Sequence, residues 1–320
     1  MAVLVAVDRW DPEPWAKRLR RLLPGRTVLT TDGDGQFAGD DAELAAVRYA
    51  LVWKPRPELL ARLANLEVLF SLGAGVDHIL SLPQLPAVPI VRIVDPDLTG
   101  RMVEYVVWQV LHHHRRGPEY ARQQAERHWR ERRQPAAREV TVGIMGLGVL
   151  GQAAAEAVAR LGFRLAGWSR SEKQLRDMAC FHGEAGLGPF LAQTDILVTL
   201  LPLTPETSGI LNYKLFAQLK RGGPLGGAVI INAGRGGSQV EADIVVALED
   251  GTLKSASLDV FETEPLPADS PLWVRSDVVI TPHNAAVSDP EALTRQIAEQ
   301  IAAYERGEPL QNLVDTRRGY

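Results

Sequence analysis

The stretch from Val140 to Gly151, V-T-V-G-I-M-G-L-G-V-L-G, constrains the fold of this chain more than any other. An apolar run rich in β-branched residues leads directly into glycines spaced as G-x-G-x-x-G. An alanine-rich segment with helical spacing, Gln152 to Arg160, follows. Strand, tight glycine turn and helix in this order predict a site for the pyrophosphate of a dinucleotide. A glycine-rich turn without a ligand is the alternative, and the strand and helix on either side of the glycines favour the dinucleotide site.

Each glycine has an expected role in that site. Gly146 would make the turn, Gly148 would let the backbone approach the phosphates, and Gly151 would let the helix pack close to its strand. The first N–H groups of a helix lack partners and lie at the positive end of its dipole, so they bind anions. The residues expected at the pyrophosphate are Gly146, Gly148, Val149, Leu150 and Gly151.

Length and charge restrict the class of protein. With 320 residues the chain exceeds what one hydrophobic core usually holds, so two domains are expected. A formal net charge of -4 gives no electrostatic reason to expect nucleic acid or an anionic membrane as a partner. Cys180 is the single cysteine, which excludes an intramolecular disulfide and argues against a thiolate zinc site. No apolar run approaches the ~18 residues of a membrane span and the N-terminus lacks signal-peptide features, so a cytoplasmic protein is expected.

Strand-like runs alternate with helical segments along the whole chain, which predicts an α/β protein with two doubly wound parallel sheets. We expect a flavodoxin-like substrate domain in residues 1–96 and a Rossmann-type dinucleotide-binding domain in residues 97–284, with a substrate cleft between them and hinges near residues 97 and 285. Residues 1–96 would lack a closing element, so residues 285–320, with a helix at 290–306, are expected to return to them. The expected strands are residues 2–7, 27–29, 49–53, 67–71, 140–144, 164–168, 195–200, 228–232, 255–260 and 278–281.

A long helical segment is predicted between the two domains. Apolar periodicity runs from Leu98 to His114, and the charged, Gln-rich segment 119–133 continues in helical register. The triplet His112-His113-His114 suggests a metal site, but consecutive helical residues lie ~100° apart and cannot chelate one ion together. A helix on the surface or at a subunit interface is therefore expected, and no metal site is predicted.

Four polar residues follow apolar strands in the second half of the chain: Arg235 in N-A-G-R-G, Asp259 and Glu264 in D-V-F-E-T-E-P, and His283 in T-P-H-N. Parallel α/β sheets bind their ligands at the carboxyl ends of the strands. These residues are therefore candidates for catalysis. The alternative is a surface ion pair of Arg235 with Glu264 and an ordinary loop histidine.

Six motifs in this order resemble the D-2-hydroxyacid dehydrogenases, and they cover essentially the whole chain. They are G-A-G-V-D at Gly73, the glycine turn at Gly146, L-P-L-T-P-E-T at Leu201, N-A-G-R-G at Asn232, L-D-V-F-E-T-E-P-L-P at Leu258 and T-P-H-N-A-A at Thr281. Further stretches look like the bacterial glyoxylate/hydroxypyruvate reductase branch of that family. They are W-K-P at Trp53, W-S-R-S at Trp168, S-P-L-W at Ser270 and the terminal R-G-Y.

The resemblance implies reduction of glyoxylate to glycolate and of hydroxypyruvate to D-glycerate. It implies that His283 is the general acid, Glu264 its carboxylate partner and Arg235 the substrate-binding arginine. These residue types suit the roles, because a reduced ketone needs a proton donor at its oxygen and a 2-oxo acid suits the planar fork of arginine. The residues implied to contact the substrate are Trp53, Ala74, Gly75 and Arg235. Trp53 is equally compatible with a half-buried tryptophan at a strand end.

Cofactor preference is indicated separately, about 20 residues after the glycine turn, where an NAD site usually carries an acid. Here Ser169 and Arg170 occupy that place, and a hydroxyl with a guanidinium suits the 2′-phosphate of NADP, so NADPH is expected to be preferred over NADH. Arg170 as an ordinary surface arginine is the alternative. The resemblance adds residues on the nicotinamide side, namely Pro202, Thr204, Ala233, Arg235, Asp259 and His283.

The resemblance also implies a homodimer, formed through residues 98–133. Two features have no counterpart in the family pattern, Arg101 and the histidines at 112–114. A formate dehydrogenase is disfavoured because it needs no proton donor at a ketone. A dinucleotide-sensing binding protein, like the transcriptional co-repressors that share this fold, is left open by the residues.

Overall fold

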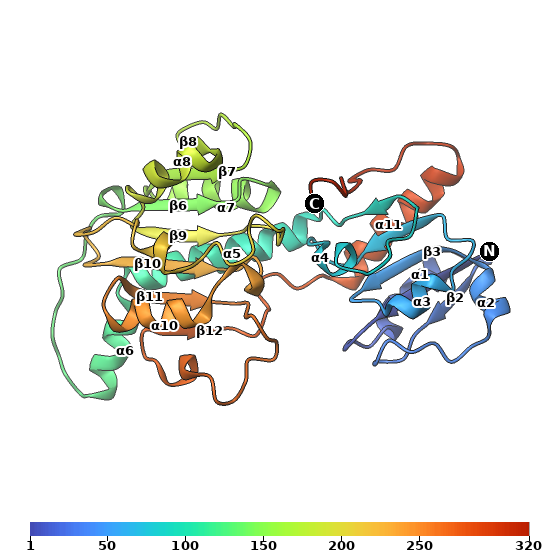
Figure 1. The fold of residues 1–320 in the computed structure, drawn as a ribbon, viewed down its shortest axis with the longest axis horizontal. Coiled ribbons are helices and arrows are strands. Elements are labelled where there is room, and N and C mark those ends of the chain that lie inside the picture. Colours follow the sequence, from blue (N-terminus) through green and yellow to red (C-terminus); the bar gives the residue numbers. More distant parts are fainter. Residues whose placement is uncertain (320) are drawn as a thin grey trace. The chain divides into compact units, whose positions relative to one another are not determined.

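The chain forms two compact units in a computed structural model that describes residues 1–319 (Figure 1). Unit 1 contains Met1–Leu98 together with the segment that begins at Ser288, and unit 2 contains Thr99–Val287. Tyr320, the last residue of the R-G-Y motif, lies outside the described residues.

Unit 1 is built on a parallel sheet with the strand order β2-β1-β3-β4-β5, the flavodoxin-like order, as predicted. Both faces of β1 are covered, so all six of its residues are buried. The strands are β1 (Ala2–Val7), β2 (Thr27–Thr30), β3 (Val47–Trp53), β4 (Val68–Ser71) and β5 (Ile90–Val91). The helices are α1 (Glu13–Leu22), α2 (Asp41–Ala45), α3 (Pro57–Ala61), α4 (Asp77–Leu80) and α11 (Pro290–Glu305).

Unit 2 is built on a parallel sheet with the order β12-β11-β10-β9-β6-β7-β8, as expected for a Rossmann-type unit. The sequence did not reveal the edge strand β8, which is short and only partly buried. The strands are β6 (Thr141–Met145), β7 (Arg164–Ser169), β8 (Ala179–His182), β9 (Ile196–Thr199), β10 (Ala228–Asn232), β11 (Leu253–Leu258) and β12 (Val278–Ile280). The helices are α5 (Pro96–His114), α6 (Gly117–Ala125), α7 (Val149–Arg160), α8 (Gly183–Leu191), α9 (Tyr213–Phe216) and α10 (Glu241–Glu249), with short 3-10 helices at Ala137–Glu139, Gly236–Ser238 and Pro271–Val274.

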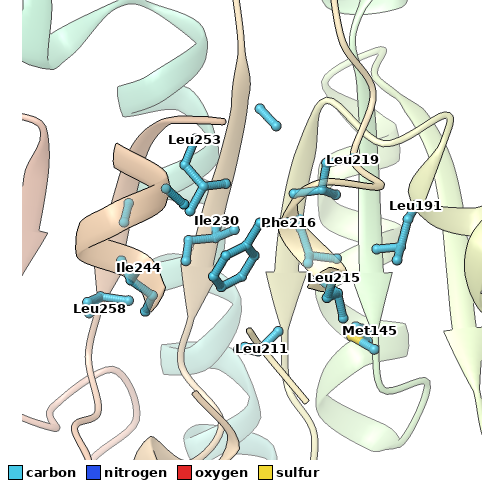
Figure 2. Packing of buried hydrophobic residues seen from close by; sticks show 14 of the residues in the cluster. Met145, Leu191, Leu211, Leu215, Phe216, Leu219, Ile230, Ile244, Leu253 and Leu258 are labelled. Carbon is cyan, nitrogen blue, oxygen red and sulfur yellow. The ribbon is translucent and has the colours of Figure 1, made fainter. Parts of the chain in front are cut away.

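Buried side chains fix the two strands whose ends carry candidate residues. Figure 2 shows Phe216 of α9 and Ile244 of α10 packed against Ile230 of β10, and Leu258 of β11 belongs to the same buried cluster. Burying side chains of this size contributes about 1.5–3 kcal/mol each. The carboxyl ends of β10 and β11 are thereby held in a defined position.

The prediction of a continuous helix through residues 119–133 was wrong. Arg116 has a left-handed backbone (φ 59°) that separates α5 from α6, and α6 ends at Ala125. Residues 126–130 are all exposed, so no apolar face packs against the sheet there. Helices depend mainly on such packing, and favourable propensity alone does not maintain one.

The histidine triplet differs from the expected surface or interface helix. His113 and His114 are buried within unit 2. His113 Nε2 lies 2.7 Å from Ser257 Oγ and its Nδ1 lies 3.0 Å from Ser255 Oγ, so the ring joins α5 to β11. Among residues 1–319, no group of three or more His, Cys, Asp or Glu side chains is arranged to hold a metal ion. The same residues contain no helix with both the length and the apolar composition needed to cross a membrane.

Candidate active site

The glycine turn has a different steric requirement at each of its three glycines. Gly146 has φ +107°, and a Cβ there would lie 2.7 Å from the Leu200 carbonyl oxygen. A Cβ at Gly151 would clash with the Gly146 carbonyl oxygen, whereas one at Gly148 would meet nothing within 4 Å. Open space at Gly148, the residue that caps α7, is what a close approach of a pyrophosphate requires. The first N–H groups of α7 lie at the positive end of the helix dipole, the kind of helix end that can bind phosphate.

The end of β7 places Arg170 in solvent and Ser169 in the interior. The Ser169 hydroxyl donates to the Ser171 carbonyl oxygen at 2.8 Å, so its proton is used within its own loop. Arg170 is thus the more available donor of the two. A hydrogen bond with Thr204, and more weakly the Arg170 guanidinium, hold the pKa of Glu206 below its usual value. Sequence reasoning did not single out Glu206, although it lies within the L-P-L-T-P-E-T motif.

The loop with Pro202 and Thr204 is held by Thr207, which was also missed. Its hydroxyl donates to the Pro202 carbonyl oxygen at 2.6 Å and accepts from the Thr204 N–H at 2.8 Å. The loop after β9 is therefore a closed turn at the same sheet edge as the glycine turn.

Arg235 follows β10 in a loop fixed by two buried amides that sequence reasoning missed. Asn232 donates to the Arg235 carbonyl oxygen at 3.2 Å and to Gln239 Oε1 at 2.8 Å. Gln239 in turn donates to the Val260 carbonyl oxygen at 2.9 Å. The loop therefore presents a half-buried Arg235, whose Nη1 donates to the Gly234 carbonyl oxygen at 2.8 Å. Ala233, the residue before this turn, is buried.

Glu264 and His283 lie in contact. His283 Nδ1 is 2.8 Å from Glu264 Oε2, and the other carboxylate oxygen of Glu264 accepts from the Phe261 N–H at 3.2 Å. A carboxylate only accepts hydrogen bonds, so Nδ1 carries the proton of this contact. Nε2 is left as the ring nitrogen that can exchange a proton with a ligand. About a third of the His283 side chain is exposed, which leaves it accessible.

Asp259 organises the turn that carries His283. It is 1% exposed and accepts from the Thr281 hydroxyl at 2.6 Å and from the N–H groups of Asn284 and Ala285, each at 3.0 Å. Its carbonyl oxygen accepts from the His283 N–H at 2.8 Å. Asp259, predicted on the nicotinamide side, thus has a direct structural contact with the histidine turn.

In unit 1, Trp53 covers the backbone of the loop after β4. A Cβ on Gly73 would clash with the Trp53 ring, so the two are in close contact. Trp10 stacks on the other ring face with centroids 5.1 Å apart, and His78 lies 4.6 Å from Trp53. Ala74 and Gly75 are half-buried beside them. Trp10 and His78 were not predicted, because their contacts join the ends of separate strands.

Comparison with known proteins confirms the family resemblance. The curated glyoxylate/hydroxypyruvate reductase A of Klebsiella pneumoniae (strain 342) is 42% identical over 327 residues, which covers all of both chains. The protein with the same description from Photorhabdus laumondii is 39% identical over 318 residues, or 97% of each chain.

Solved structures agree over the same length. The NADPH-dependent glyoxylate/hydroxypyruvate reductase of Sinorhizobium meliloti, in complex with NADP and sulfate, superposes with a TM-score of 0.91 at 48% identity and covers all of both chains. The D-isomer specific 2-hydroxyacid dehydrogenase of Xanthobacter autotrophicus Py2, in complex with NADPH and MES, has a TM-score of 0.92 at 43% identity and covers 100% of this chain and 99% of that chain. Residues 107–285 match the family model described as "D-isomer specific 2-hydroxyacid dehydrogenase, NAD binding domain". On this evidence the chain belongs to the D-isomer specific 2-hydroxyacid dehydrogenases.

Proposed function

We propose that this protein reduces small 2-oxo acids, glyoxylate to glycolate and hydroxypyruvate to D-glycerate, with NADPH preferred over NADH. The observation that carries the proposal is the 2.8 Å contact between His283 Nδ1 and Glu264 Oε2. It lies beyond β12, at the sheet edge that also carries the glycine turn and Arg235. The names of the similar reductases support the same activity.

The proton step follows from the geometry of the pair. Bound NADPH supplies hydride to the carbonyl carbon. His283 donates a proton from Nε2 to the carbonyl oxygen, where negative charge develops. Glu264 holds Nδ1 and orients the ring. General acid catalysis of this kind contributes roughly 10²- to 10⁴-fold to the rate.

Substrate recognition is assigned to residues of both units. The planar fork of Arg235 binds a carboxylate oxygen and the carbonyl oxygen together. In unit 1, the backbone N–H groups of Ala74 and Gly75 are suited to donate to a substrate carboxylate. Trp53, held between Trp10 and the Gly73 backbone, limits the size of the group next to the carbonyl.

The preference for NADPH is assigned to Arg170. This guanidinium is exposed at the end of β7, in the place where an NAD site carries an acid. The pyrophosphate is assigned to the open space at Gly148 and the first N–H groups of α7. Similar reductases crystallised with NADP or NADPH support this assignment.

We also propose a homodimer formed through residues 98–133. Large apolar side chains are exposed in that segment, with Trp108 at 49%, Tyr120 at 40% and Trp129 at 103% of full exposure. Such side chains are enriched at the centres of protein interfaces. Sedimentation equilibrium of the protein and of Trp129→Ser tests the assignment, and a monomeric parent protein would refute it.

Steady-state kinetics test the function. Loss of nicotinamide absorbance is measured with glyoxylate, hydroxypyruvate and larger 2-oxo acids, each with NADPH and with NADH. His283→Ala should lower kcat roughly 10²- to 10⁴-fold. His128→Ala, at an exposed histidine next to Glu126, should retain the parent rate. If NADPH binds but no 2-oxo acid is reduced, the dinucleotide-sensing alternative is supported instead.

A further inference from the structure

A series of three hydrogen-bonded side chains, Tyr105, Thr281 and Asp259, leads from α5 to the turn that carries His283. Tyr105, 7% exposed on α5, has its hydroxyl oxygen 3.0 Å from Thr281 Oγ1, and Thr281 Oγ1 lies 2.6 Å from Asp259 Oδ1. The two carboxylate oxygens of Asp259 also accept from the N–H groups of Asn284 and Ala285. Asp259 thus accepts three hydrogen bonds, from the Thr281 hydroxyl and from the N–H groups of Asn284 and Ala285, as a carboxylate does.

The direction of each hydrogen bond follows from that carboxylate. A carboxylate only accepts, so the Thr281 hydroxyl donates to Asp259. The Thr281 oxygen is then left as an acceptor, and the Tyr105 hydroxyl donates to it. Burial raises the pKa of Tyr105, so its hydroxyl keeps its proton throughout the pH range of an assay. The hydrogen bonds therefore all run in one direction, from the Tyr105 hydroxyl through the Thr281 hydroxyl to the Asp259 carboxylate.

His283 depends on this chain because its backbone is strained. Its φ is +51°, a left-handed conformation that residues with side chains rarely adopt. The His283 N–H donates to the Asp259 carbonyl oxygen at 2.8 Å, and Asp259 holds the next two N–H groups of the turn. Asp259 Oδ1 is shared between Thr281 and Asn284, so loss of the hydroxyl chain removes one of the three hydrogen bonds that hold the carboxylate. A shift there moves the histidine ring.

We propose that Tyr105 is a positioning residue for the proton donor, whose hydroxyl acts through Thr281 and Asp259 to hold His283 in its left-handed turn. This inference rests on the proposed function, because it assigns Tyr105 to the same proton step. Tyr105 touches neither substrate nor cofactor in this role. Its effect is confined to the placement of the His283 ring against Glu264.

Removal of the hydroxyl tests the inference. Tyr105→Phe should lower kcat for glyoxylate reduction roughly 5- to 50-fold, because small displacements of a catalytic group are costly. KM for glyoxylate and Kd for NADPH should change by less than about twofold, since Tyr105 is not among the residues assigned to either ligand. Thr281→Val should show the same loss, and Thr281→Ser, which keeps the hydroxyl, should restore the parent rate. The matched control is Tyr213→Phe, which loses a hydroxyl 2.7 Å from Asp250 on the surface of the same unit and should be unaffected.

A double-mutant cycle separates positioning from general stability. With His283→Ala already present, Tyr105→Phe should cause no further loss of kcat, because the group that it positions is gone. An equal loss in both backgrounds, or a parent kcat in Tyr105→Phe, overturns the inference. If Tyr105→Phe fails to fold, the Thr281→Val and Thr281→Ser pair gives the same comparison. If His283→Ala keeps the parent rate, the proposed function is refuted. If His283→Ala loses activity but Tyr105→Phe does not, only the role of Tyr105 is refuted.

Discussion

In the proposed mechanism, the direction of the reaction that His283 can assist depends on whether its ring, held by Glu264, carries a proton. Reduction requires the protonated ring and oxidation of the alcohol requires the neutral ring. We therefore expect kcat/KM for reduction to fall as pH rises and that for oxidation to rise. Glu264→Gln keeps the size of the side chain but replaces the carboxylate 2.8 Å from Nδ1 with an amide, so kcat/KM for reduction should fall because the proton donor is held less well. The measurement is kcat/KM against pH in both directions.

Glu262→Gln is the control for that profile. Glu262 is an exposed carboxylate two residues away whose partner is the Glu241 N–H, so its substitution should leave the profile in place. A Glu264→Gln profile that superimposes on the parent profile would show that Glu264 does not hold the proton donor in place.

In the proposed function, Arg170 is the residue that makes NADPH preferred over NADH. Loss of one charge-assisted contact to a 2′-phosphate costs ~1.5–3 kcal/mol, or roughly 10- to 100-fold in affinity. Arg170→Ala should weaken NADPH binding by that factor and leave NADH binding nearly unchanged. Fluorescence titration of both cofactors gives the two values of Kd. Arg176→Ala, at a fully solvated arginine a few residues further on, should change neither, and equal losses for both cofactors in Arg170→Ala would indicate a structural role.

At the scale of elements, His113 links α5 to β11 and makes their packing depend on pH. Burial, chiefly, lowers the pKa of His113 from 6.5 to about 3 in the folded protein. Between those values the unfolded chain binds a proton that the folded chain does not, so stability falls as pH decreases through this range. The fall should reach up to roughly 1.4 kcal/mol per pH unit. The measurement is the free energy of unfolding in urea at neutral and mildly acidic pH.

In His113→Asn, the free energy of unfolding should decrease less steeply with falling pH than in the parent protein. This holds whether or not the variant is less stable at neutral pH. His128→Asn removes an exposed histidine and should keep the slope of the parent protein. If the free energy of unfolding depends on pH equally in His113→Asn and in the parent protein, His113 does not cause the loss of stability at acidic pH.

Elements with a local signal were the ones that could be predicted from the sequence. The glycine turn and α7 could be predicted because the close neighbours of Gly146 and Gly151 leave no room for a side chain. Arg235 and His283 became candidates because each lies three residues after the end of an apolar strand, and their roles stay predictions. The end of α6 could not be predicted, because packing decided it and propensity did not. The contact of Tyr105 with Thr281 was also hidden, since 176 residues separate the two.

At the scale of the whole molecule, the chain leaves unit 1 after Leu98 and returns to it at Ser288. On one face of the unit 1 sheet, Val3 and Val5 share a buried cluster with α1 and α11. Ion pairs also join this region to α11. Arg18 and Arg21 of α1 pair with Glu291, and Arg26, which follows α1, pairs with Glu305. Surface pairs contribute little each, so the apolar face of α11 supplies most of this attachment.

Weakening the packing of α11 should therefore lower the stability of unit 1 and leave that of unit 2 unchanged. Ile297 is 2% exposed and lies in the core of unit 1, so Ile297→Ala should destabilise that unit by ~2–5 kcal/mol. Hydrogen exchange should become faster in β1 and β3 and remain unchanged in β6 and β10, because the buried clusters of the two sheets share no residue. Glu299→Ala, at an exposed position of the same helix, is the control and should leave exchange as it is. Faster exchange of β6 in Ile297→Ala would mean that the two units unfold as one cooperative body, and α11 would then stabilise the whole chain.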